Sequence, residues 1–222
     1  MPHARLPGEP RAAGSLAAAS LLSLVWLATA LPANATTLRK MDLPEIVSLA
    51  DRVVDARAIS RNVYWDPSGT QIYTDTTFEV LAEAKGQGLA MLTVTLLGGR
   101  IDPIEMREEG TPAFSLGEEV VLFTLERPDG KSNLVGFTQG VMRVQPEADT
   151  GEKFAVSEVP LGVTLVDPGQ TQAAATRPSP LRAPLLALLD QVRQIVDGTQ
   201  PAGPAIATTP ETDPLGVEGG NP

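Results

Sequence analysis

Polar and apolar residues alternate most regularly between residues 72 and 80, and this pattern predicts a β-strand with one buried face. A period of two is typical of a strand that packs one side against a core. The intervening positions, such as Tyr73 and Asp75, are polar or amphipathic and are expected on the other side. The side that faces the core holds Ile72, Thr74, Thr76, Phe78 and Val80.

A second segment, EVVLFTLE at residues 119–126, is apolar on both faces and therefore predicts a central strand. Turn residues at 66–69, 128–130 and 149–151 separate it from weaker strand patterns, and a long loop is expected over residues 100–116. The weaker patterns cover residues 53–59, 90–97, 133–139, 141–145 and 153–157. Short strands at this hairpin spacing predict a mainly β domain, either a small barrel or a β-sandwich.

A short helix is expected just before the first strand. Asp42 and Glu45 have the spacing of a capping box, and Pro44 suits the first turn of a helix. A helix that packs one face against a core has apolar residues three or four positions apart. This spacing occurs at Leu43, Ile46, Val47 and Ala50.

A second, amphipathic helix is expected over residues 181–198, with Pro184 near its start and Gly198 just past its end. Its apolar stripe consists of Leu185, Leu188, Leu189, Val192, Ile195 and Val196. The regular period favours docking of this stripe on the β-domain. Because a Pro-rich linker precedes the helix, binding to a partner or to a second copy remains the alternative interpretation.

The N-terminus has the plan of a signal peptide, which predicts an exported protein, periplasmic or extracellular. Arg5 and Arg11 precede an apolar run, and Ala33-Asn34-Ala35 offers a small-x-small cleavage site. The apolar run, residues 16–31, is shorter than the roughly 20 residues that span a bilayer. Cleavage is therefore favoured over a membrane anchor.

These patterns divide the chain into five parts: a signal peptide (1–35), a β-domain (38–166), a linker (167–180), an amphipathic helix (181–198) and a disordered tail (199–222). The linker and the tail are rich in proline and show no hydrophobic periodicity, which is typical of segments without a packed core. The β-domain is long enough to bury a core of its own.

The charge of the chain restricts its partners. Of 17 basic and 27 acidic residues, the predicted signal peptide holds two and one, so the remaining 15 and 26 leave a net charge of −11. A protein this acidic repels nucleic acid and anionic lipid, so neither nucleic acid nor a membrane is an expected partner after cleavage. The sequence leaves the oligomeric state open.

Missing residue types restrict the chemistry further. The single histidine, His3, lies in the predicted signal peptide, and the chain has no cysteine. The mature chain would therefore lack an imidazole base, a thiol nucleophile, the usual zinc ligands and disulfides. No pair of carboxylates stands out for hydrolysis. The acidic residues of the long loop also lack the spacing of a calcium-binding loop; they are Asp102, Glu105, Glu108 and Glu109. Taken together, these absences lead us to expect no catalytic residue, no metal and no cofactor.

Three residues are candidates for contact with a partner protein. Trp65 is the only tryptophan beyond residue 35, and it lies next to Tyr64 just before a turn. Aromatic residues often anchor interfaces, although packing at the rim of a barrel is the other interpretation of this pair. Arg100 follows two glycines and either contacts a partner or caps the end of a strand.

The order of several landmarks resembles a family of uncharacterised exported bacterial proteins. The landmarks are turn and strand segments without catalytic motifs, and they span about half the chain. They read LPEIVSLADRVVDARA (43–58), a tryptophan turn, IYTDTTFEVLAEAKG (72–86), TVTLLGG (93–99), PAFSLGEEVVLF (112–123) and VGFTQG (135–140). The resemblance implies a co-exported protease of the matrixin type as a partner.

The same order is distantly similar to the netrin-like modules, which include the tissue inhibitors of metalloproteinases. That similarity implies an OB-type barrel of five strands. The inhibitors place an N-terminal cysteine on the catalytic zinc and brace it with disulfides. Here the predicted mature N-terminus is Thr36 and no cysteine exists, so inhibition by that route is not expected.

Taken together, the sequence predicts a small OB-like barrel with one helix before it and one after it. The leading functional expectation is an exported, non-enzymatic binding or interaction module that acts on a co-exported protease. The alternatives are a hydrolase that uses carboxylates and a structural protein of the cell envelope.

Overall fold

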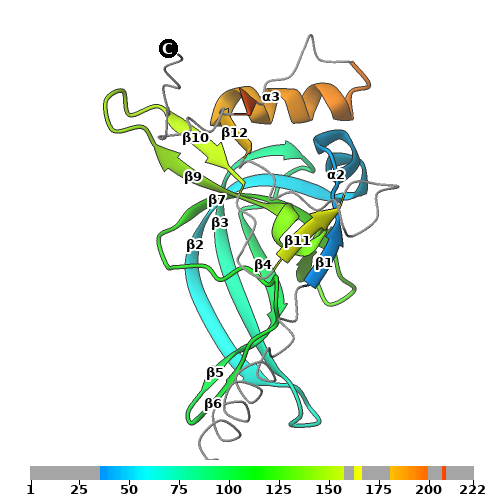
Figure 1. Cartoon of the computed structure of the whole chain (residues 1–222), viewed down its shortest axis with the longest axis vertical. Coiled ribbons are helices and arrows are strands. Elements are labelled where there is room, and N and C mark those ends of the chain that lie inside the picture. Colours follow the sequence, from blue (N-terminus) through cyan, green and yellow to red (C-terminus); the bar gives the residue numbers. More distant parts are fainter. Residues whose placement is uncertain (1–35, 158–162, 167–180, 200–206, 209–222) are drawn as a thin grey trace, which may run out of the picture. The chain divides into compact units, whose positions relative to one another are not determined.

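Five strands close into a β-barrel (Figure 1). Their order around the barrel is β2-β3-β4-β8-β7, with β7 pairing back to β2, and only β4 and β8 run parallel to each other. The fold is therefore a small OB-like barrel, as expected from the sequence, and not a sandwich. The barrel strands are β2 (Arg52–Trp65), β3 (Ile72–Lys85), β4 (Met91–Leu97), β7 (Glu119–Glu126) and β8 (Ser132–Leu134).

This structure is a computed structural model, and it describes residues 36–157, 163–166, 181–199 and 207–208. The expected signal peptide and linker lie outside the described residues, as does most of the expected tail.

Further strands extend the sheet beyond the barrel. β9 pairs with the first half of β7, and β10, β12 and β13 follow it in order, while β1 and β11 form a separate parallel pair. Their bounds are β1 (Thr36–Arg39), β9 (Val141–Pro146), β10 (Lys153–Val156), β11 (Val163–Val166), β12 (Leu181–Pro184) and β13 (Ala207–Thr208). The hairpin of β9 and β10 is the one that the turn at residues 149–151 predicts.

One buried cluster fills the inside of the barrel. Val120 and Leu122 of β7 point inward, and Phe78 of β3 meets the ring of Phe114 edge-on, with the ring centroids 5.0 Å apart. The other members of this cluster are Val54, Ala56, Ala58, Leu92, Val94, Leu134 and Val141. Residues on alternate positions of β2 and β7 therefore share one interior, which is the arrangement that period-two patterning predicts.

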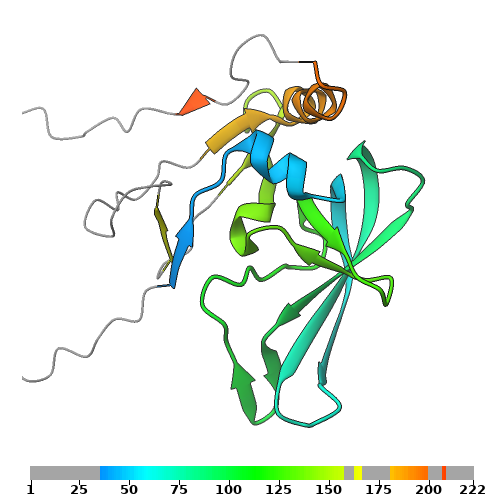
Figure 2. The ribbon, with the colours of Figure 1, turned by 90° about the vertical axis from the view of Figure 1, so that its right-hand side faces the viewer.

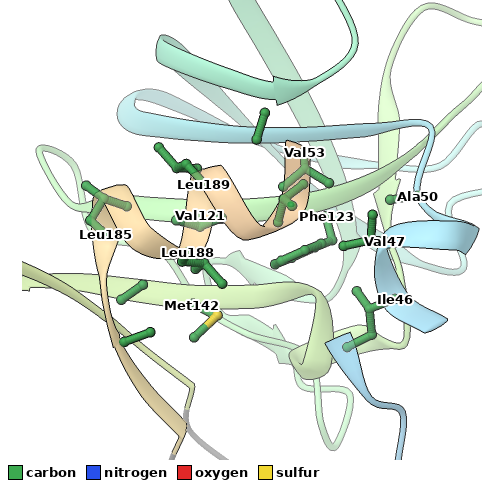
Figure 3. Packing of buried hydrophobic residues seen from close by; sticks show 14 of the residues in the cluster. Ile46, Val47, Ala50, Val53, Val121, Phe123, Met142, Leu185, Leu188 and Leu189 are labelled. Carbon is green, nitrogen blue, oxygen red and sulfur yellow. The ribbon is translucent and has the colours of Figure 1, made fainter. Parts of the chain in front are cut away.

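A second buried cluster lies on the outer face of β2 and β7, where two helices cover it (Figure 3). These helices are α2 (Leu43–Leu49) and α3 (Leu185–Val196). Val121 and Phe123 of β7 point to this side, toward Leu188 and Leu189 of α3. The structure thus decides between the two interpretations of the C-terminal helix: its stripe docks on the barrel, and only its last member, Val196, is largely exposed.

The start of α2 follows the sequence expectation in part. The Asp42 carboxylate accepts a hydrogen bond of 2.8 Å from the backbone N–H of Glu45, as an N-cap does. The Glu45 side chain does not complete a capping box, because it pairs with Arg39 instead. At the other end of α2, the Lys85 ammonium group donates to the carbonyls of Val47 and Ala50, which satisfies two unpaired helix carbonyls.

Two expectations from the sequence were wrong, one for a strand and one for a loop. The segment 133–139 does not continue as a strand, because β8 ends at Leu134 and the chain turns into the 3₁₀ helix η1 (Phe137–Gly140). Gly136 and Phe137 both have left-handed backbone angles, with φ of 58° and 56°. This conformation lies outside the β region and therefore ends the strand. The expected loop of residues 100–116 holds a hairpin of β5 (Gly99–Ile101) and β6 (Ile104–Met106).

Docking of α3 predicts a large cost for truncating its buried face. Leu188 is fully buried, so Leu188→Ala should lower the free energy of unfolding by about 2–5 kcal/mol in urea denaturation. Leu186 is 75% exposed on the same helix, and Leu186→Ala should leave stability nearly unchanged. Equal stability of the two variants would show that the helix is not part of the folded core.

Candidate functional site

One mouth of the barrel opens into a cleft of about 480 Å³. One wall is the inner face of β2, β3 and β4, where β2 and β3 run past the end of β7. The other wall is the β5–β6 hairpin together with residues 107–114. Figure 2 shows the hairpin opposite the parts of β2 and β3 that extend beyond β7. The residues that line the cleft include Arg61, Val63, Thr74, Leu96, Arg100 and Arg107.

Close approach of the backbone at Gly99 positions the hairpin over the sheet. A Cβ atom at Gly99 would lie 2.6 Å from both the Thr74 hydroxyl and a Val63 methyl, and φ at Gly99 is 145°. Only glycine fits this position, since a side chain would meet both atoms and the backbone angle is one that other residues rarely adopt. The Thr74 hydroxyl also donates to the Gly98 carbonyl at 2.7 Å. The glycine pair therefore fixes the hairpin above the cleft.

Three arginines line the cleft, and they differ in their partners. Nε of Arg100 lies 2.7 Å from the Asp102 carboxylate, and Nε of Arg107 lies 2.6 Å from that of Glu105. Within the described residues, Arg61 has neither a hydrogen-bond nor an ion-pair partner. Among the described residues, Arg61 is therefore the cleft arginine without a paired carboxylate, and it lies on the rim formed by β2, while the exposed Glu108 also lines the cleft.

The structure brings only one of the three predicted contact residues into the cleft lining. Arg100 lies there, whereas Tyr64 lies on the opposite face of the sheet. Trp65 is half-buried at the end of β2 and, by alternation, shares the face of Val63, but it is not among the lining residues. The first described segment, β1, packs beside η1, where Gln139 binds the carbonyl of Arg39.

Tyr64 belongs to a polar network on the outer face. The Asp75 carboxylate accepts hydrogen bonds from the Tyr64 and Thr95 hydroxyls and, at 2.7 Å, from the Lys131 ammonium group. Burial by itself raises the pKa of Asp75, but these hydrogen bonds outweigh it, so the pKa lies below its usual range. The network ties the β7–β8 turn to β2 and β3, so the Tyr64 hydroxyl has a structural partner.

Sequence reasoning missed Arg61 and Arg107. Extending the strand pattern would not have placed Arg61, because Val54, Ala56 and Ala58 face the barrel interior and a regular strand would put Arg61 on the outer face. The irregularity between Ala58 and Ser60 reverses the alternation and brings Arg61 to the face of Val63. The expected strand stopped at residue 59. No local signal identifies Arg107, because its position depends on the hairpin that folds back over the sheet.

Away from the cleft, Asp55 is a buried carboxylate on the outer face of β2. Its side chain is 5% exposed, and its Oδ1 atom has no hydrogen-bond partner in the described structure. Burial, and then the nearby charge of Glu119, raise the pKa of Asp55 to about 6, although Lys153 and Arg57 oppose the shift. Glu119 itself binds Lys153 at 2.7 Å. Because Asp55 is buried, a substrate has no access to this pair.

The described residues hold neither a metal-binding cluster nor a membrane-spanning helix. No group of three or more acidic, histidine or cysteine side chains in them is arranged to hold a metal ion. No helix within the described ranges is both long and apolar enough to cross a membrane.

No model of a known protein family matches the sequence, and no curated protein is significantly similar to it.

The raised pKa of Asp55 predicts a stability that falls with increasing pH. The folded state holds the Asp55 proton up to about pH 6 and the unfolded state only to about pH 4, so ionisation above that range costs up to about 3 kcal/mol. Asp55→Asn should therefore raise the free energy of unfolding at pH 8 by as much as about 3 kcal/mol and change it little at pH 4.

Asp66 supplies a control of opposite sign. Hydrogen bonds from Ser68 and from backbone N–H groups lower the pKa of this exposed turn residue to about 2. Asp66→Asn should therefore destabilise the protein at neutral pH, with the loss disappearing as the pH falls toward 2. Denaturation of both variants from pH 2 to pH 8 checks the two signs. A pH-independent effect of Asp55→Asn would contradict the assignment.

Proposed function

We propose that this chain is an exported, non-enzymatic binding module that holds a segment of a partner protein in the barrel-mouth cleft. The observation that carries the proposal is Arg61 on the rim of the cleft, whose side chain pairs with none of the residues that the structure describes. A guanidinium that has no internal partner is available for a carboxylate of a ligand, and arginine binds carboxylates through paired hydrogen bonds.

The walls of the cleft support a protein ligand in particular. Val63, Leu96 and Phe114 give an apolar surface, and Thr74 and Thr111 add a few hydroxyl groups. Mouths of β-barrels with such a mixture of apolar and polar groups are common ligand sites. The acidic charge of the chain argues against nucleic acid, which many OB-type barrels bind.

The carboxylates of the cleft do not favour catalysis. Glu105 is partly exposed and bound to Arg107, and Glu108 is exposed. Catalytic groups usually lie in an enclosed pocket, and both of these side chains are exposed to solvent. A binding role does not need an enclosed carboxylate.

Export and a protease partner are parts of this proposal that rest on the sequence. Residues 1–35 have the plan of a signal peptide, and the landmarks at 43–140 resemble exported proteins that accompany matrixin-type proteases. Because the chain has no cysteine, it cannot bind a zinc ion through a terminal cysteine. The proposed mode of action is therefore contact through the cleft.

Arg61→Glu should abolish capture of the partner. The full chain, immobilised after purification, is incubated with exported proteins from the producing cell, and retained proteins are identified and assayed for protease activity. Charge reversal at Arg61 places two carboxylates against each other, so the specific partner should be lost.

Arg127→Glu is the matched control. Arg127 is a partly exposed arginine outside the cleft lining and, unlike Arg61, it is paired, with Asp129 at 2.9 Å. The control should retain the partner as the wild type does. Retention of the same proteins by Arg61→Glu, or retention of none by the wild type, would overturn the proposed function.

A further inference from the structure

We infer that the segment held in the cleft is an extended peptide that adds to the sheet as a further strand along residues 61–65 of β2, with an acidic side chain against Arg61. This inference rests on the proposed function and names its ligand. It follows from three observations: the unequal lengths of β2 and β7, the direction of the backbone groups of β2, and the charge at that edge.

β2 is much longer than the strand that pairs with its outer edge. β7 pairs with β2 only from Arg52 to Arg57, and the last backbone bonds on this side join Ala58 to Gly117 and Glu118. Among the described residues, no strand pairs with that edge of β2 from residue 59 onward. β3 continues to pair with the opposite edge as far as Trp65.

The backbone groups of Arg61, Val63 and Trp65 point to this free edge. The N–H of Asp66 donates to Gln71, so it points toward β3, and the direction alternates along an antiparallel strand. Trp65 pairs with Ile72, whose carbonyl is bound by Gly98 on the far side of β3. Trp65 therefore faces away from β3, and so do Val63 and Arg61.

An open edge of this kind is a template for strand addition. Its N–H and C=O groups supply affinity for any extended chain, while the neighbouring pockets select side chains. Here the selecting groups are the Arg61 charge and the apolar surface of Val63, both of which line the cleft. Alternate side chains of the added strand would enter the cleft, so an acidic residue followed by apolar residues at a spacing of two fits best.

A charged residue on an edge also discourages pairing between copies of a protein. If that were the whole role of Arg61, no peptide would bind. If the edge instead paired with a second copy of this chain, a doubled mass would appear in light scattering. Either result would overturn the inference.

The test is selection from a library of random linear peptides about eight residues long, enough to cover the free edge. The full chain is used in a Trp26→Phe background, so that Trp65 is its only tryptophan and reports binding at the edge. Selected peptides should be rich in Asp, Glu and β-branched residues and poor in proline, and they should change the Trp65 fluorescence.

Val63→Pro removes an edge donor without removing a bond to β3, so it should weaken the selected peptides about tenfold while the barrel stays folded. Val63→Ala is the matched control, which trims the side chain but keeps the N–H and should bind more tightly than Val63→Pro. Peptides with N-methylated backbone donors should bind about tenfold more weakly to the wild type, whether or not Val63→Pro folds. Arg61→Gln should reduce the preference for Glu over Gln in the peptide by about threefold or more.

The outcomes separate this inference from the proposed function. Strand addition is overturned if capture of the partner depends on Arg61 but not on the Val63 N–H, and if N-methylation of the peptides has no effect. That result leaves the proposed binding module in place. Failure to capture any partner overturns the proposed function, whatever the peptides do.

Discussion

Strand β7 has to bury both of its faces, and the rest of the structure depends on that constraint. Val120 and Leu122 fill the barrel, while Val121 and Phe123 form the floor of the outer cluster. A barrel of only five strands encloses little volume, and the chain has no cysteine to supplement it with a disulfide. The outer cluster therefore adds a second core, and α2 and α3 are the elements that cover it.

The same strand determines where the cleft forms. β7 has 8 residues and β2 and β3 have 14 each, so the ribbon of β2 and β3 extends beyond the end of β7, with β4 still paired to β3 there. An isolated ribbon is only marginally stable in water. β4 and the hairpin of β5 and β6 support this ribbon on its other edge and its inner face, and β2 is left with an unpaired edge next to Arg61. A site is thus built from the mismatch in strand length.

The sequence predicted the fold class and most of its strands, because these depend on local patterns. Alternation over residues 72–80 identified the inner face of β3, and the double-sided run at 119–126 identified the shared strand. It missed the full length of β2, since exposed positions such as Arg61 and Asn62 break the apolar pattern where the strand leaves the core. It also missed the β5–β6 hairpin, which has few buried residues to mark it.

Of the candidate contact residues Trp65, Tyr64 and Arg100, the structure places only Arg100 in the lining of the cleft. Tyr64 and Trp65 are adjacent, and adjacent residues of a strand point to opposite faces, so composition alone cannot show which of them meets a ligand. The sequence by itself determined which residue types are available, the period of each strand and the apolar stripe of α3. The tertiary structure decided that the stripe docks and that no described side chain pairs with Arg61, because these depend on which strands end first and on what packs against the edge that remains.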